Sequence, residues 1–344
     1  KQGISVFDKN VKIPKVCSPF SVIPKGYLKW YQDLFMEGKR CEPPENMDMS
    51  SPVVFAVTKV LGDNHLQITL IKEFKDDLAI KKVYFTDTGK VTVTENRIYT
   101  SSYTARTNNG VLCMTPKNAQ LIEVIRSRDN LEVLDVVSKK VIHKTPMNIQ
   151  GIMGYDNRTY IKNGPNILEL NFLEVPNKVI TTTKTVARVL ENSSVMYEGV
   201  VIQDMFGTYY ASVFPEPGTH KQVVLKELKG HKIVNAKFDS RVLCVLSSIR
   251  GRYYKSFFGF KHDFTEYTHR VADDISILDI NFVCLENGIC ANINDQENLE
   301  LFHFNSSGIK EIQSGSVSSE TRLYKHGIEV YITKDNALYK LKTK

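Results

Sequence analysis

Between residues 281 and 305, apolar residues alternate with polar ones in short runs that polar breaks separate. Phe282 and Cys284 begin the pattern, the run 289–293 continues it, and residues 299–304 resume it after the polar break 294–298. Alternation of this kind is typical of strands that bury one face. The stretch therefore predicts two or three short strands joined by turns.

Comparable strand, turn, strand patterns occur at residues 157–172, 207–228, 241–260 and 328–341. Their starts lie roughly 40 to 50 residues apart, a period that is typical of β-propeller blades. Residues 51–344 shared among seven blades give about 42 residues for each, the usual size of four strands with their turns. The pattern predicts an all-β propeller of seven blades, with six or eight as the alternatives.

The first blade is expected to hold strands near residues 53–57, 65–71, 82–85 and 91–93. The seventh blade, in contrast, is cut short by the end of the chain. A propeller closes well when one blade takes strands from both ends of the chain. We therefore expect a strand near Val53, or one from the N-terminal arm, to complete the seventh blade.

The first fifty residues differ from the rest, so the chain divides into an arm and helix over 1–50 and a propeller over 51–344. Residues 1–23 predict an extended arm, and an amphipathic helix follows Pro24. Its apolar stripe consists of Tyr27, Trp30, Tyr31, Leu34 and Phe35. The stripe either packs on the neighbouring domain or forms a docking helix for another chain. In the first case, deletion of residues 1–44 destabilises the propeller.

Two resemblances follow from particular residues. The segment 24–44 resembles one that follows the kinase-like domain of some bacterial and phage multidomain proteins, through Tyr27, Trp30, Phe35, Gly38, Arg40, Pro43 and Pro44. Tyr31 stands where that pattern has Phe, and the resemblance implies only that a kinase-like portion precedes this chain. The Gly230-His231 pair is similar to part of a WD repeat, but no Trp-Asp dipeptide follows, so the likeness to WD40 propellers is one of architecture.

Composition indicates an ordinary protein with a mild basic bias, since 24% of the residues are charged and the formal net charge is +7. No apolar run has the length of a membrane span, so no membrane partner is expected. The chain begins with Lys1 rather than Met, which favours a piece of a longer protein. Cys113, Cys244, Cys284 and Cys290 lie in apolar strand-like runs, and buried reduced thiols of this kind predict a cytoplasmic location.

Sequence motifs for catalysis or for cofactor binding are absent, including the phosphate-binding and dinucleotide-binding glycine patterns. No cofactor is expected. The densest set of metal-ligand residue types is His262, Asp263, Glu266 and His269, whose spacing suits a solvated connector between blades better than a metal site.

Basic residues gather between 220 and 270, with eleven Lys and Arg against four Asp and Glu. A partner-binding surface is predicted there from Arg250, Arg252, Tyr253, Tyr254, Lys255 and Lys261. Such a surface suits an acidic protein or a nucleic acid, because cations hold phosphates and aromatic rings stack on bases. The alternative is a solvated face, with the aromatic residues packed between blades.

The favoured function is a non-catalytic protein-interaction or scaffold module that presents its loops, because propellers carry function in their loops. One alternative is a regulatory or sensory domain of a larger kinase-like protein. The other is an enzyme with its site in the central channel, the less favoured class. The sequence leaves the oligomeric state open.

Overall fold

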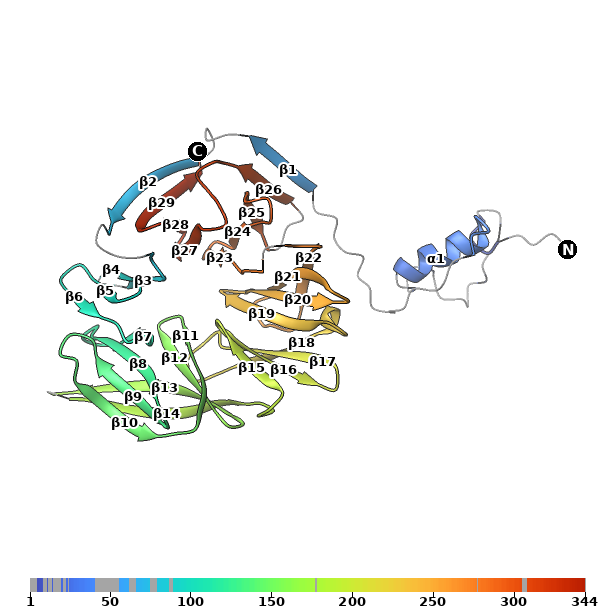
Figure 1. The fold of residues 1–344 in the computed structure, drawn as a ribbon. Helices are drawn as coiled ribbons and strands as arrows, with labels where there is room; N and C mark the ends of the chain where they lie inside the picture. The colour runs from blue at the N-terminus through green and yellow to red at the C-terminus, as the bar shows by residue number, and fades with distance from the viewer. Residues whose placement is uncertain are drawn as a thin grey trace. The chain divides into compact units, whose positions relative to one another are not determined.

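Seven sheets surround a central space (Figure 1), six of them four-stranded and antiparallel and one with a fifth, parallel strand. The structure is a computed structural model that describes residues 5–8, 11, 14, 20, 23, 25–40, 56–61, 66–74, 79–86, 89–176, 178–276, 278–304 and 308–343. The chain divides into two compact units, residues 1–55 and 56–344. The second unit is a seven-bladed β-propeller, which confirms the predicted fold class and blade number.

The first three strands of each blade are consecutive in sequence, and strands are counted here from the centre of the ring outward. The first strands are β3 (Lys82–Thr86), β7 (Val111–Met114), β11 (Ile149–Tyr155), β15 (Ser194–Tyr197), β19 (Lys232–Asp239), β23 (Phe282–Cys284) and β27 (Arg322–His326). The second strands are β4 (Gly89–Val93), β8 (Leu121–Ser127), β12 (Arg158–Asn163), β16 (Val200–Met205), β20 (Val242–Ile249), β24 (Ile289–Ile293) and β28 (Glu329–Lys334). The third strands are β5 (Arg97–Tyr99), β9 (Asn130–Asp135), β13 (Asn166–Val175), β17 (Thr208–Val213), β21 (Arg252–Phe260), β25 (Leu299–His303) and β29 (Ala337–Thr343).

The fourth strand, counted from the channel, follows the third in sequence in every blade except blade 7. Blades 1 to 6 have β6 (Thr104–Arg106), β10 (Val141–Pro146), β14 (Lys178–Arg188), β18 (Lys221–Leu225), β22 (Tyr267–Asp273) and β26 (Gly308–Gln313) in this place. Blade 7 receives β2 (Leu66–Glu73) from the other end of the chain, antiparallel to β29. Blade 6 has a fifth strand, β1 (Ala56–Leu61), which runs parallel to β26.

The ring is therefore closed as predicted in principle, but by a different strand. The strand that completes blade 7 is β2, which the sequence pattern placed in blade 1, and the strand nearest to Val53, β1, joins blade 6. Blade 1 consists of β3 to β6. Residues 53–55 lie outside the described part of the chain.

The core lies between neighbouring sheets, because each strand turns alternate side chains toward the next blade. In β9 the burial alternates residue by residue, with Leu131 and Val133 fully buried. Between blades 4 and 5, a cluster around Phe238 and Phe258 fills the gap. Phe257 and Phe260 are buried as well, so these aromatics pack between blades as expected. Cys113, Cys244, Cys284 and Cys290 are buried free thiols.

The first unit is described mainly through its helix α1 (Lys25–Phe35), which confirms the predicted helix. Its aromatic side chains contact one another: the ring centroids of Trp30 and Tyr31 lie 4.9 Å apart, and those of Tyr31 and Phe35 lie 6.0 Å apart. Phe35 is 58% exposed within the described chain. No described helix has the length and apolar character that a membrane span requires.

Candidate functional site: the mouth of the central channel

The first strands of the blades enclose a cavity of about 1220 Å³. Residues of β3, β7, β11, β19, β23 and β27 line it, and Glu198 enters it directly after β15. At one end of the cavity, its lining comes from the turns between first and second strands and from the loops 214–221 and 261–266. We call this end the channel mouth. All seven blades contribute to it, so its shape depends on the closed ring.

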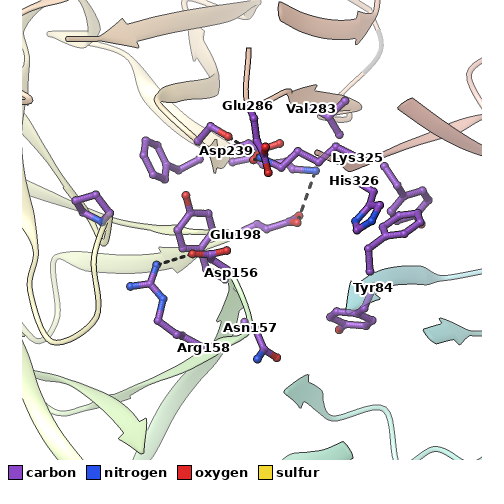
Figure 2. Close-up of a pocket in the computed structure, with 18 of the residues that line it drawn as sticks. Tyr84, Asp156, Asn157, Arg158, Glu198, Asp239, Val283, Glu286, Lys325 and His326 are labelled. Carbon is purple, nitrogen blue, oxygen red and sulfur yellow. Dashed lines mark hydrogen bonds and ion pairs between the residues drawn. The ribbon is translucent and has the colours of Figure 1, made fainter. Parts of the chain in front are cut away.

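Glu198 projects into the channel (Figure 2). Its Oε1 lies 3.6 Å from Nζ of Lys237, and its side chain is 47% exposed. The positive charge of Lys237 lowers the pKa of Glu198, burial acts in the opposite direction, and Lys82 on β3 adds to the lowering. Glu198 is therefore an anion at neutral pH.

A second charged group joins blades 5, 6 and 7. Asp239 at the end of β19 forms an ion pair with Lys325 of β27. Both also bind the backbone of Cys284: its N–H donates to Asp239 Oδ2 at 2.9 Å, and its carbonyl accepts from Lys325 Nζ at 2.8 Å. The Asp239 side chain is only 10% exposed. A buried ion pair needs such additional hydrogen bonds to offset the loss of water, and here they hold three blades in register.

Further contacts connect the other blades at the mouth. Arg158 Nη2 lies 3.2 Å from Oδ2 of Asp156 and donates to the carbonyl of Phe214 in blade 4 at 2.9 Å. Asn157 Oδ1 accepts from the backbone N–H of Met114 in blade 2 at 2.8 Å. The ring of His326 in blade 7 stacks on Phe85 in blade 1, with centroids 5.0 Å apart. The mouth is thus a polar surface with charges of both signs, and contacts between the blades hold it together.

The residues predicted from the basic window lie at different places. Arg250 and Arg252 are exposed around the tip of the β20–β21 hairpin, and Tyr253 and Tyr254 are half-buried behind them. Lys255 is only 2% exposed. Lys261 lies past the other end of β21, where it forms an ion pair with Glu266. The structure therefore groups the arginines and tyrosines but separates them from Lys261, and partner binding stays a prediction.

The four residues of the 262–269 cluster do not converge on one point. His262 and Asp263 line the channel mouth, whereas His269 on β22 stacks on Phe258, with ring centroids 4.7 Å apart. Within the described residues, no three His, Cys, Asp or Glu side chains are placed to bind a metal ion.

Sequence reasoning missed Glu198, Asp239 and Lys325. Each lies at the end of the first strand of its blade or directly after it. The corresponding positions in the other blades include Tyr155-Asp156 and Met114-Thr115, which also line the cavity. An alignment of the repeats by their first strands would have shown that these residues occupy equivalent positions, and it is the signal that could have predicted the site.

The geometry defines a seven-bladed β-propeller with a charged channel mouth. No protein-family model and no curated protein sequence matches the chain. Among solved structures it is similar to the N-terminal domain of Nup159, with 9% identity over 84% of this chain and 99% of that chain and a TM-score of 0.48. It is also similar to Hsv2 of Kluyveromyces lactis, with 13% identity over 78% of this chain and 98% of that chain and a TM-score of 0.46. BamB from Moraxella catarrhalis has 10% identity over 81% of this chain and 98% of that chain, with a TM-score of 0.42. At these identities the likeness concerns the fold and says nothing about function.

Proposed function

We propose that the chain is a non-catalytic interaction module that receives a segment of another protein at the channel mouth. The observation that carries the proposal is the set of fixed charges around Glu198, supplied by separate blades of a closed ring. Glu198 lies 3.6 Å from Lys237 and its side chain remains 47% exposed, so it is held in place yet reachable from the channel. Charges fixed in advance favour recognition, because they lose little conformational freedom on binding.

The same geometry supports recognition better than proton transfer. A general acid or base works best with a pKa near the operating pH, and the charge of Lys237 moves the pKa of Glu198 away from neutrality. The channel-enzyme alternative therefore has less support. A regulatory role beside a kinase-like portion rests on the resemblance of residues 24–44 alone and stays outside the proposal.

Selection from a random peptide library displayed on phage, with the full chain immobilised, tests the proposal. We expect peptides that share a consensus and whose affinity falls by about tenfold or more in Glu198→Gln, since close charge pairs across an interface contribute about 1.5 kcal/mol or more. Glu320→Gln, an exposed acid in the β26–β27 connection, is the matched control and should leave affinity unchanged. Failure to select a consensus, or equal binding to both variants, would count against a binding site at the mouth.

A further inference from the structure

An aromatic residue forms the tip of the β16–β17 hairpin in blade 4. Met205 and Thr208 are paired, so Phe206 and Gly207 alone make the turn, with φ angles of 54° and 80°. A two-residue turn with positive φ at both positions is of type I′, which strongly favours Asn, Asp or Gly. A bulky residue with positive φ is strained. Phe206 therefore occupies a position where its own backbone preference opposes the fold.

The Phe206 side chain contributes no packing that could offset this strain. At 106% of its reference area, it is the most exposed of the large apolar side chains in the described residues. The 2.7 Å hydrogen bond from the backbone N–H of Gly207 to Asp204 Oδ1 stabilises the turn without involving the ring. Strained residues that persist without local benefit concentrate at functional sites.

The tip lies at the end of the propeller opposite the channel mouth. Strand β16 starts at Val200, beside Glu198 at the mouth, so its last residue points to the other end. The same argument places there the tip of the β20–β21 hairpin, since β20 starts beside Arg241 at the mouth. It also places there the connection 226–231, because β18 begins at Lys221, another residue of the mouth.

Side-chain contacts join these three segments across blades 4 and 5. The hydroxyl of Tyr209, two residues after the turn, donates to the carbonyl of His231 at 2.7 Å. The His231 ring packs edge-on against Tyr254, with centroids 5.2 Å apart. The two hairpin tips and the connection between them therefore form one surface.

Four exposed cations, besides Lys226, lie on the same three segments as Phe206. They are Lys229 and Lys232 in and after the connection, and Arg250 and Arg252 around the second tip. None has an ion-pair partner within the described residues. Of the acids in these segments, Asp204 accepts from the turn, and Glu227 accepts from the Tyr267 hydroxyl at 2.7 Å. We call Phe206 with these four cations the tip surface.

We propose that the tip surface binds an acidic segment of a protein partner, with Phe206 inserted into an apolar site of that partner. Positive charge around one aromatic anchor matches the usual arrangement of an interface, in which a central aromatic contributes most and charges at the rim direct association. A single-stranded nucleic acid fits less well, because it needs successive free rings for stacking. Here Phe206 is fully free, whereas Tyr209 and Tyr254 are engaged with His231. This site is separate from the channel mouth.

Fluorescence anisotropy of the full chain tests the proposal with two labelled probes, a peptide in which Glu alternates with Leu and an oligothymidylate of equal charge. We expect salt-sensitive binding of the peptide that falls by about tenfold in Phe206→Asn and further in the double variant Arg250→Glu, Arg252→Glu. Phe206→Asn restores the favoured Asn-Gly turn and should raise the melting temperature. Loss of affinity in a more stable protein cannot come from misfolding.

Arg128→Glu is the matched control, because Arg128 is an exposed residue with positive φ at the tip of the β8–β9 hairpin of blade 2. It should leave peptide affinity unchanged. The proposal is overturned if neither probe binds, if Phe206→Asn binds as tightly as the parent, or if the oligothymidylate binds more tightly with the same dependence on Phe206. Glu198→Gln should bind the peptide normally, so failure here and failure at the channel mouth are separable.

Discussion

Single buried carboxylates hold irregular segments of this chain in place. Glu123 on β8 is fully buried and accepts four hydrogen bonds from the segment that connects blade 1 to blade 2. The donors are Thr107 Oγ1 at 2.8 Å, the backbone N–H of Asn108 at 2.7 Å, Asn108 Nδ2 at 2.8 Å and the backbone N–H of Gly110 at 3.1 Å. The carboxylate replaces the pairing that a strand would otherwise provide for these groups.

Replacement of Glu123 by Ala should therefore lower the free energy of unfolding by about 3 kcal/mol or more, since a hydrogen bond to a charged group contributes about 1.5–3 kcal/mol and several are lost together. Urea denaturation of the parent and the variant measures the loss. Glu320→Ala, which removes an exposed carboxylate, is the control and should stay within about 0.5 kcal/mol of the parent. A loss no larger than that of the control would show that water reaches the 107–110 segment.

At the scale of elements, the β13–β14 hairpin links blade 3 to blade 2. Glu174 near its tip is buried and accepts from Thr115 Oγ1 at 2.7 Å and from the backbone N–H groups of Lys117 at 2.6 Å and Asn118 at 3.1 Å. Burial acts to raise the pKa of Glu174, but these hydrogen bonds outweigh it and hold the pKa below its usual value. The hairpin thus fixes the turn after β7.

This lowered pKa predicts how the stability depends on pH. A carboxyl group whose pKa is lower in the folded chain stabilises the fold above its unfolded pKa of about 4.3, and this contribution disappears as the pH falls through the folded pKa. Glu174→Gln should melt about 2–4 °C below the parent at neutral pH. The difference should narrow below about pH 4. Thermal melts from neutral to acidic pH test this, with Glu95→Gln as an exposed control; a difference independent of pH would contradict the assignment.

Strands were predictable where the partner is the next strand in the chain. The runs 111–114, 121–125 and 131–134 correspond to β7, β8 and β9, because alternation locates a strand and a short turn dictates its neighbour. Alternation also located β2, but the prediction that it belongs to blade 1 was wrong, since it pairs with β29 in blade 7. Alternation identifies which face is buried and carries no information about a partner at the other end of the chain.

The sites were harder to predict for a related reason. Glu198, Asp239 and Lys325 come from three blades, and no local spacing connects them. The sequence did not indicate that Phe206 is exposed and strained, because an apolar residue in a strand-rich segment is expected to be buried. Both properties follow from the type of turn in which it lies. The basic window identified Arg250 and Arg252, but burial of Lys255 follows from the position of its strand inside the blade.

For the whole molecule, stability depends on the closure of the ring. Strand β2 pairs with β29 from Leu66↔Thr343 to Glu73↔Ala337, and the Leu66 side chain is 5% exposed within the core of blades 6 and 7. Without β2, the outer edge of β29 would have no partner strand, and the first and last blades would lose their covalent tie through the chain. Leu66 thus belongs to a strand pair that joins the two ends of the propeller sequence.

Two truncations distinguish how much the closing strand and the first unit each contribute to the stability of the propeller. Removal of residues 1–73 eliminates β1 and β2, and we expect failure to fold or a fall in melting temperature of more than about 10 °C, since several kcal/mol of strand pairing and apolar burial are lost. Removal of residues 1–44 keeps both strands. Loss of the apolar stripe between Tyr27 and Phe35 should then lower the melting temperature by less than removal of residues 1–73 does.

Calorimetry measures the contributions of β2 and of the first unit to stability. The proteins compared are the two truncations and the full chain with Leu66→Ala or Leu70→Ala. Both substitutions remove the same atoms from β2, but Leu70 is 54% exposed. Leu66→Ala should cost about 2–3 kcal/mol and Leu70→Ala less than about 1 kcal/mol. Equal costs, or a 1–73 truncation that melts like the parent, would mean that the ring is stable without its closing strand. An unchanged melt for the 1–44 truncation would instead mean that the α1 stripe packs on a partner outside this chain.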